Sequence, residues 1–253
     1  MDVRIVTREP EGGSVTFCGH ADAEKARAFH RTMPGYEPTP LVRLEALAHR
    51  LGIASLSVKD ESKRFGLNAF KVLGGSYCMA SLVHERLGLT GAPDFAAVTS
   101  AEARERLGPQ TFVTATDGNH GRGVAWTARQ LGQRSFVYMP KGSAEQRLRN
   151  IAMYATEARI TDLCYDDAVR YADRMARENG WTLVQDTSWP GYEDVPRRIM
   201  QGYTTMALEA EEQLRGERPT HIFLQCGVGS MAGAVAAFFS DCEPALRPRI
   251  IVV

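Results

Sequence analysis

Apolar positions follow two alternating patterns along the chain from about residue 111 onward. Short apolar runs, which are typical of buried strands, alternate with longer segments in which apolar residues recur at the spacing of one helix face. Strands that alternate with helices in this way predict parallel βαβ units with right-handed crossovers. The predicted strands cover residues 111–116, 134–140, 158–164, 181–186, 221–227 and 249–253, and the predicted helices cover 121–132, 144–155, 166–180, 197–217 and 231–241.

One segment interrupts this alternation. Residues 187–196, "TSWPGYEDVP", are rich in turn-forming residues and are long enough to cross from one domain to another. A chain of 253 residues has room for one large α/β domain or for two smaller ones. The run 249–253 predicts a buried parallel strand, whose open edge would need cover. We expect either a partner on that strand or further sequence after it, and we favour further sequence.

Composition narrows the class of protein. An apolar fraction of 44% and a charged fraction of 24% are ordinary for a globular chain, and a formal net charge of zero does not favour a nucleic-acid partner. No apolar run approaches the roughly 20 residues that span a bilayer, and the start "MDVRIVTREPEGG" lacks the apolar core of a secretory signal. Five cysteines without CxxC spacing predict neither a disulfide framework nor a zinc site. We expect a reduced, cytoplasmic protein with no membrane partner.

Lysine is scarce in this chain, because only five of the 30 basic residues are lysines. Arginine keeps its proton near neutral pH, whereas lysine can lose it and form an imine, which makes Lys71 a candidate nucleophile. We expect Asn68 to cap a helix that runs to about Arg86, so that the helix dipole and partial burial favour the neutral amine. Gly74 and Gly75 would leave room for a planar cofactor beside the backbone. The alternative is a solvated lysine on an amphipathic helix.

A second candidate segment is "TATDGNHGRGVAW", which follows a predicted strand and begins a predicted helix. The carboxyl end of a strand in an open parallel sheet is the usual position of a ligand crevice. Asp117, Asn119 and His120 place a carboxylate, an amide and an imidazole on one glycine-rich turn. A capping turn is the alternative interpretation, but capping requires only one such residue.

A third segment, "LQCGVGSMAGAV", also predicts a strand, a glycine loop and a helix. Gly227, Gly229 and Gly233 are spaced GxGxxxG, one residue away from the dinucleotide pattern GxGxxG. Backbone N–H groups of such a loop can hold a phosphate at the positive end of the helix. No Gly-Lys-Ser/Thr sequence follows, so a single phosphate suits the loop better than a nucleoside triphosphate. Glycines needed only for packing are the alternative.

These three segments together favour one cofactor. An amine that can form an imine, a polar turn at a sheet crevice and a phosphate cradle suit a molecule with one aldehyde and one phosphate. That molecule is pyridoxal phosphate, bound as a Schiff base of Lys71. An unrelated dinucleotide-binding protein is the rival hypothesis, which Lys71 and the glycine spacing disfavour.

The sequence resembles the fold-type II pyridoxal-phosphate enzymes and, within them, the diaminopropionate ammonia-lyase family. The resemblance implies an α/β fold with two three-layer αβα domains and mainly parallel sheets. It implies a large cofactor-binding domain at 1–76 and 189–253, incomplete here because the family continues beyond the equivalent of Val253, and a small domain at 77–188. The segments that carry the resemblance, in family order, are "GYEPTPL", "VKDESKRFGLNAFKVLGG", "TATDGNHGRGVAW", "YMPKGSA", "VQDTSW", "GYEDVP", "IMQGY" and "GVGSMAG".

The resemblance also implies roles for individual residues. Lys71 would bind the cofactor's aldehyde, and Asn119 would hydrogen-bond the oxygen on its ring. Asp117 stands where related hydroxyamino-acid dehydratases have a small or hydroxyl residue. The backbone from the glycine loop into the helix would hold the phosphate, at Gly227, Val228, Gly229, Ser230 and Met231.

The implied reaction removes ammonia from D- or L-2,3-diaminopropionate and gives pyruvate and two molecules of ammonia. Asp117 would position the second ammonium of this substrate and act as a base on the face of Cα opposite Lys71. Asp186, at the end of a predicted strand, is a candidate for binding the substrate's amino groups, and a cap on the next loop is its alternative role. The resemblance further implies a homodimer. Rival functions are a serine/threonine dehydratase, a β-replacement synthase and a non-catalytic remnant that binds pyridoxal phosphate or a partner.

Overall fold

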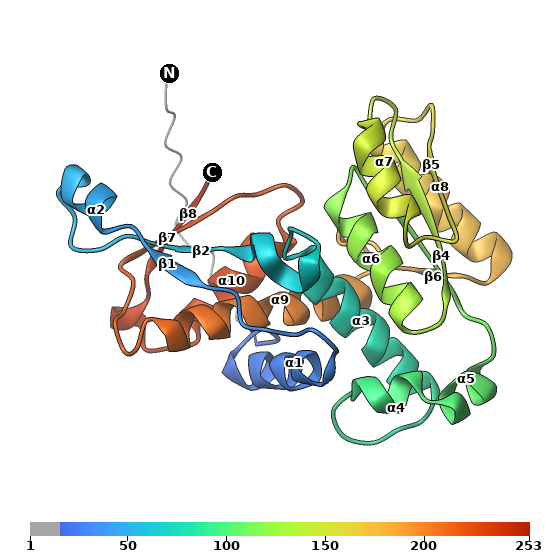
Figure 1. Cartoon of the computed structure of the whole chain (residues 1–253), viewed down its shortest axis with the longest axis horizontal. Helices are drawn as coiled ribbons and strands as arrows, with labels where there is room; N and C mark the ends of the chain where they lie inside the picture. The colour runs from blue at the N-terminus through green and yellow to red at the C-terminus, as the bar shows by residue number, and fades with distance from the viewer. Residues whose placement is uncertain (1–15) are drawn as a thin grey trace.

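Two bodies of secondary structure lie on either side of helix α3 (Lys71–Arg86) in the computed structural model, as Figure 1 shows. The structure describes residues 16–253; the segment 1–15, which includes the whole stretch expected not to be a secretory signal, lies outside the described residues. One body contains a four-stranded parallel sheet, and the other contains two small sheets and the helices α1 (His20–Thr32), α2 (Glu45–Leu51), α9 (Asp194–Gln213) and α10 (Ser230–Ser240). This arrangement confirms the α/β class and the parallel pairing.

The four-stranded sheet has the order β5-β4-β3-β6, and all of its strands are parallel. The last strand is much shorter than the predicted 181–186, because the chain soon leaves the ladder: the Gln185 N–H donates to the Tyr192 hydroxyl at 2.9 Å. The strands are β3 (Thr111–Ala115), β4 (Arg134–Met139), β5 (Glu157–Ile160) and β6 (Thr182–Leu183).

Helices cover both faces of this sheet, because successive side chains of a strand point to opposite faces. Val113 and Ala115 pack with the small side chains of one helix, α8, whereas Val137 and Met139 pack on the other face. The result is the expected three-layer arrangement in this part of the chain. The helices are α6 (Asn119–Gln130) and α7 (Glu145–Ala152) on one face and α8 (Tyr165–Asn179) on the other.

The second body is built around helices that pack on α3. Helix α9 crosses α3 closely: a Cβ atom on Gly74 would lie 2.5 Å from a ring carbon of Tyr203 and 2.8 Å from the Ile199 carbonyl oxygen. Gly75 faces the backbone of Gly123 in α6. The glycine pair therefore serves helix packing, and the expected role beside a cofactor is wrong. The elements are α1 (His20–Thr32), α9 (Asp194–Gln213), α10 (Ser230–Ser240) and the parallel strands β7 (His221–Leu224) and β8 (Arg249–Val252).

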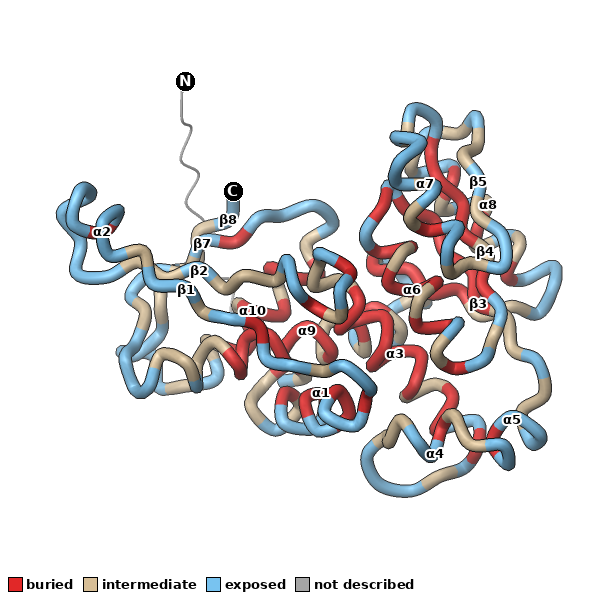
Figure 2. The backbone as a smooth tube through the Cα atoms, viewed as in Figure 1, coloured by how far each residue is buried: buried red, intermediate tan, exposed pale blue. Residues whose placement is uncertain are grey.

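Several short elements had no clear signal in the sequence. An antiparallel pair of strands and a helix extend as an arm from the second body, and Figure 2 shows the arm mostly exposed while α3, α9 and the large sheet are buried. These elements are β1 (Leu41–Arg43), α2 (Glu45–Leu51), β2 (Ser57–Lys59), α4 (Phe95–Thr99), α5 (Ala101–Leu107) and the 3-10 turns Glu61–Gly66 and Pro244–Leu246.

The start of α3 also differs from expectation. Asn68 is not its N-cap; Asn68 adopts a left-handed backbone with φ of 56°, Phe70 occupies the cap position, and Lys71 is the first helical residue. The predicted end at Arg86 is confirmed. The predicted boundary between residues 76 and 77 falls inside this continuous helix, and the domain boundaries stay a prediction.

Across residues 16–253, no helix is long and apolar enough to cross a membrane. All five cysteines lie in this range, and all are free thiols.

Candidate active site

Lys71 lies where the two bodies meet, at the first position of α3. Its Nζ contacts Oδ2 of Asp186, which follows β6. The side chain of Lys71 is 21% exposed and that of Asp186 is 4% exposed. The aromatic rings of Phe70 and Tyr203 have their centroids 5.7 and 5.9 Å from Nζ. The amine is therefore held by one buried carboxylate and two aromatic faces, in a place where some water still reaches it.

His120 is the third titratable residue of this cluster. Its Nδ1 lies 3.7 Å from Oδ2 of Asp186, and its Nε2 lies 2.8 Å from the carbonyl oxygen of Val184. Because a carbonyl oxygen only accepts, Nε2 carries the proton and Nδ1 faces the carboxylate. Burial lowers the pKa of His120, and the nearby Asp186 only partly opposes this effect. His120 is therefore a neutral imidazole at neutral pH.

Asp186 is ionised at this site. Burial acts to raise the pKa of its carboxyl group, but His120 and Lys71 act more strongly together and lower that pKa below its ordinary value. The carboxylate lies at the carboxyl side of the parallel sheet, since it follows the end of β6. Lys71 and Asp186, both predicted as site residues, are thus brought together. The direct contact between them was not anticipated.

The glycine-rich turn before α6 divides its polar side chains between two environments. The Thr116 hydroxyl accepts hydrogen bonds from the N–H groups of Gly118 and Gly121 at 3.0 and 3.1 Å, which fixes the turn. His120 points into the buried cluster, whereas Asn119 is exposed at the first helical position. The Asp117 side chain is 74% exposed and lies 3.5 Å from the Arg147 guanidinium. Within residues 16–253, Asp117 and Asn119 thus make no hydrogen bond or ion pair with Lys71.

The glycine loop joins β7 to α10 and is open to solvent. Gly227 and Val228 are exposed, and a Cβ atom on Gly227 would have no heavy atom within 4 Å. Gly229 has φ of 92°, a left-handed backbone that other residues rarely adopt. Ser230 and Met231 are buried at the start of α10. The loop therefore has the open backbone that an anion-binding turn needs.

Four of the ten buried side-chain polar atoms that lack a hydrogen-bond partner among the described residues lie in this part of the molecule. They are Nδ1 of His120, Oγ1 of Thr187 beside Asp186, the hydroxyl of Tyr203 and Oγ of Ser230. A buried polar group without a partner costs about 1–3 kcal/mol, so such groups commonly have a functional reason. The Lys71 amine, three unpaired hydroxyls and a helix start fit a ligand that has an aldehyde and a phosphate. The residues present therefore fit pyridoxal phosphate.

Three members of this cluster escaped prediction from the sequence. Phe70, Thr187 and Tyr203 have no polar pattern around them that sets them apart. Tyr203 belongs to the segment "IMQGY", which supports the family resemblance, but its helical period predicts only a core position. Contact with Lys71 follows from the crossing of α9 and α3, which is a property of the tertiary structure.

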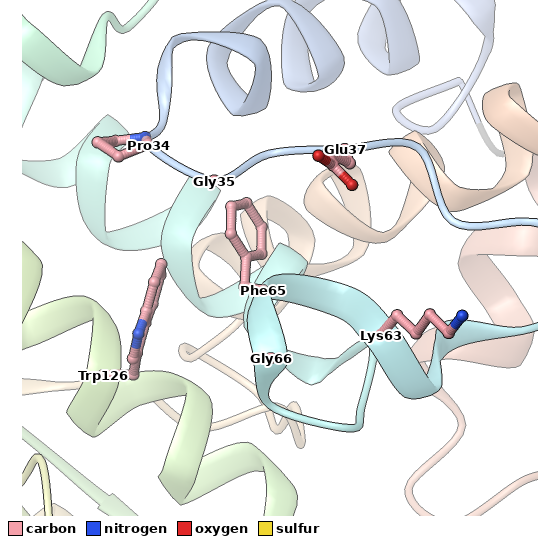
Figure 3. Close-up of a pocket in the computed structure, with 7 residues that line it drawn as sticks. All are labelled: Pro34, Gly35, Glu37, Lys63, Phe65, Gly66 and Trp126. Carbon is pink, nitrogen blue, oxygen red and sulfur yellow. The ribbon is translucent and has the colours of Figure 1, made fainter.

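A separate cavity of about 160 Å³ opens between the 3-10 turn before α3 and helix α6. Figure 3 shows Phe65 near its centre, with Trp126 and Pro34 to one side and Glu37 and Lys63 to the other. Phe65 packs against Trp126 with 5.2 Å between ring centroids. None of the predicted site residues lines this cavity, so it is distinct from the cluster around Lys71.

Comparisons with known proteins point to one family. The profile of the family described as "Pyridoxal-phosphate dependent enzyme" matches residues 32–253. A diaminopropionate ammonia-lyase from Salmonella typhimurium is 53% identical over 230 residues, which are 89% of this chain and 57% of that protein. The Escherichia coli diaminopropionate ammonia-lyase in complex with D-serine superposes with a TM-score of 0.89 and 47% identity, over 95% of this chain and 62% of that one.

More distant similarity extends to a biosynthetic L-threonine dehydratase from Salmonella typhimurium, which is 28% identical over 89% of this chain and 38% of that protein. The chain spans less than two thirds of the length of each of these relatives.

Proposed function

The chain belongs to the family of pyridoxal-phosphate-dependent enzymes, and from this premise we propose that it is an ammonia-lyase acting on 2,3-diaminopropionate. The reaction consumes one molecule of D- or L-2,3-diaminopropionate and one of water, and it releases pyruvate and two molecules of ammonia. The observation that carries this proposal is the contact between Lys71 and the buried carboxylate of Asp186, with His120 behind it.

Pyridoxal phosphate, when bound, supplies an aldehyde for amines and a ring that stabilises negative charge on the substrate's Cα. Lys71 would hold its aldehyde carbon, and Asn119 would bind the oxygen on its ring. The backbone from Gly227 to Met231 would hold the phosphate, since this loop is open and leads into a helix N-terminus. Asp186 would keep the amine of Lys71 in place and would then bind an amino group of the substrate.

Two groups would move the proton at Cα. The Lys71 amine would remove it from one face, and Asp117 would remove it from the other face, which would allow both D and L substrates. The Asp117 carboxylate is exposed and only loosely paired with Arg147, so it remains available to the second ammonium of the substrate. A carboxylate suits an ammonium better than a hydroxyl, which favours diaminopropionate over serine or threonine.

We also propose a cytoplasmic homodimer. Free thiols at all five cysteines are consistent with a reducing compartment. The arm formed by β1, α2 and β2 has an exposed apolar surface that a second copy could cover, consisting of Val42, Leu47, Leu51, Ile53 and Val58. Size-exclusion chromatography with light scattering tests this part, and a monomer at micromolar concentration would contradict it.

The proposed activity is tested by spectroscopy and product assay on the same preparation. Purified protein incubated with pyridoxal phosphate should develop the visible absorption band of a lysine-bound pyridoxal, and Lys71→Ala should abolish it. Lys25→Ala is the matched control, because Lys25 is an exposed lysine on α1. Pyruvate release is then compared for D- and L-diaminopropionate, serine and threonine, with diaminopropionate expected to be the best substrate.

The remaining outcomes separate the rival functions. Faster pyruvate release from serine, or conversion of threonine to its 2-oxo acid at a higher rate, would favour a dehydratase. A normal absorption band without any product would favour a protein that binds the cofactor but does not catalyse. A missing band would remove the cofactor assignment.

A further inference from the structure

Two buried hydroxyl groups without partners meet at the start of α10. Tyr203 is completely buried and Ser230 is 8% exposed, and neither hydroxyl oxygen has a hydrogen-bond partner in the part of the chain that the structure describes. The two residues lie on helices that pack together, since a Cβ atom on Gly233 of α10 would lie 3.1 Å from the end of the Met200 side chain of α9. Burial raises the pKa of Tyr203 well above its ordinary value, and the nearby Ser230 hydroxyl opposes that rise. Two unpaired donors this close together suit a shared acceptor better than they suit a packed core.

Tyr203 also lies beside the reactive amine. Its ring centroid is 5.9 Å from Nζ of Lys71 and 5.2 Å from the ring centroid of Phe70, which it meets edge-on. The absence of a side chain at Gly74 admits the ring to this position, since a Cβ atom there would be 2.5 Å from a Tyr203 ring carbon. Tyr203 therefore lies next to Lys71 and, through its hydroxyl, next to the first residue of α10.

The helix start adds further donors. α10 is 11 residues long, and the N–H groups of its first turn have no acceptor within the helix. They lie at the positive end of the helix dipole, which favours an anion. Gly229 turns the chain into the helix through a left-handed backbone, and the loop before it is exposed. An anion placed here could accept from the backbone and from both buried hydroxyls.

We propose that Tyr203 is a phosphate-binding residue, whose hydroxyl donates to the same phosphate monoester dianion as the Ser230 hydroxyl and the first N–H groups of α10. The site is then formed by two helices, α9 and α10, and extends beyond the glycine loop. The Tyr203 ring lies between the phosphate position and Lys71. It would thereby set the distance between the phosphate end and the aldehyde end of the ligand. The identity of that ligand as pyridoxal phosphate rests on the proposed function, whereas the anion pocket does not.

The test compares three ligands on Tyr203→Phe, a variant that keeps the ring and removes the hydroxyl. A hydrogen bond to a charged group contributes strongly to binding, so its loss should raise the Kd for pyridoxal phosphate about tenfold or more. Thermal stabilisation by inorganic phosphate should shrink, whereas the Kd for pyridoxal, which lacks the phosphate, should be unchanged. The Tm of the ligand-free variant should be equal to or higher than that of the parent, because a buried unpaired hydroxyl has been removed.

Ser230→Ala should reproduce these changes, and it carries the test if Tyr203→Phe does not fold. In that event ultraviolet difference spectra with and without phosphate are compared for the parent and for Ser230→Ala. Phosphate should shift a tyrosine absorption band to longer wavelength in the parent and not in the variant. Two matched controls should leave all three ligand affinities unchanged. Tyr77→Phe removes a buried tyrosine hydroxyl elsewhere on α3, and Ser135→Ala removes a buried unpaired hydroxyl at the start of β4.

Unchanged affinity of Tyr203→Phe for pyridoxal phosphate would overturn the inference. An equal loss of pyridoxal and pyridoxal phosphate binding would also overturn it, because the contact would then be with the ring. A normal absorption band in the parent together with unaffected variants would reject only this inference. Phosphate binding that depends on Tyr203, without any absorption band, would instead reject the proposed function and leave the anion pocket in place.

Discussion

Two buried groups of charged side chains in this molecule contrast in how fully their hydrogen bonds are satisfied. One surrounds Glu209 on α9, and the other surrounds Asp186 after β6. The oxygens of Glu209 accept from Arg64 at 2.9 and 2.7 Å, from the Lys59 ammonium at 2.7 Å and from the Tyr36 hydroxyl at 2.7 Å. Each oxygen of this carboxylate therefore has at least two partners.

The group around Asp186 is far less complete. Asp186 receives the Lys71 ammonium, but His120 Nδ1 lies 3.7 Å away and makes no hydrogen bond. The hydroxyls of Thr187 and Tyr203 nearby are also unpaired. The same kinds of side chain are thus buried with vacant donors and acceptors.

The comparison shows that ionisation does not distinguish a structural cluster from a functional one. Burial acts to raise the pKa of both carboxyl groups, and neighbouring basic groups lower both below their ordinary values. Hydrogen-bond satisfaction does distinguish them. A complete network such as that of Glu209 holds one arrangement of the chain, whereas the incomplete one around Asp186 retains groups that can bind a ligand.

The largest expected effect is on folding stability when the complete network is broken. Glu209→Gln leaves the buried Lys59 without a countercharge and leaves Arg64 with Glu61 alone, so the free energy of unfolding should fall by about 3–5 kcal/mol. Urea denaturation followed by circular dichroism measures this change. Glu217→Gln breaks an exposed, water-screened pair with Arg43 and should leave the free energy of unfolding nearly unchanged. A loss below about 1 kcal/mol for Glu209→Gln would contradict the structural role.

Breaking the incomplete cluster should affect activity instead. Asp186→Asn removes the carboxylate that holds the Lys71 amine, and pyruvate release from diaminopropionate should fall about 100-fold or more. The free energy of unfolding should change by less than about 1.5 kcal/mol, because Lys71 still reaches water. Asp166→Asn on the exposed start of α8 serves as the control for activity. A stability loss as large as that of Glu209→Gln would remove the distinction between the two clusters.

A smaller effect on folding stability is expected where α9 crosses α3, beside the cluster around Asp186. Gly74→Ala would push a methyl group against the Tyr203 ring and the Ile199 carbonyl, so unfolding should become easier by about 1–3 kcal/mol. Gly75→Ala is the matched control, since its new Cβ would lie 3.7 Å from the nearest atom, and helix propensity predicts a gain of up to about 1 kcal/mol. Urea titrations of both variants test this, and equal stabilities would contradict the close approach of α9 to α3.

The smallest expected effect is the pH-dependent stabilisation from the partly exposed cluster of His20, Glu211 and Asp241. Burial alone would lower the pKa of His20, but hydrogen bonds to Asp241 and Glu211 and their charges raise it above its ordinary value of 6.5. This stabilisation is complete below pH 6.5 and is lost as the pH rises through the raised pKa of the folded protein. It should be below about 1 kcal/mol, because water screens a pair that is nearly half exposed.

His20→Gln should therefore lower the Tm at pH 5.5 more than at pH 8.5, as measured by differential scanning calorimetry in low salt. An equal change at both pH values would show that the charge of His20 does not contribute. Burial lowers the pKa of His30 to about 3, so His30 lowers stability as the pH falls below 6.5, but it does so equally in the parent and in His20→Gln and cancels from their difference.

Much of the fold could be predicted from the sequence because its signals are local. The apolar run at 111–116 became β3, and the helical period at 166–180 became α8, closed by Gly180 in a left-handed conformation. The start of α3 could not be predicted in this way. Asn68 has the composition of a cap, but its left-handed backbone is fixed by the turn that leads to Lys71.

The sequence by itself determined the α/β class, the open glycine loop before α10 and the choice of Lys71, because each depends on residues that are neighbours along the chain. Only the tertiary structure decided which groups meet that lysine. Asp186 and Tyr203 reach it from separate segments, the loop after β6 and helix α9, and their contacts depend on how the helices and the sheet pack. No local pattern encodes such distances, since they are set by side-chain volumes at helix crossings such as the one at Gly74.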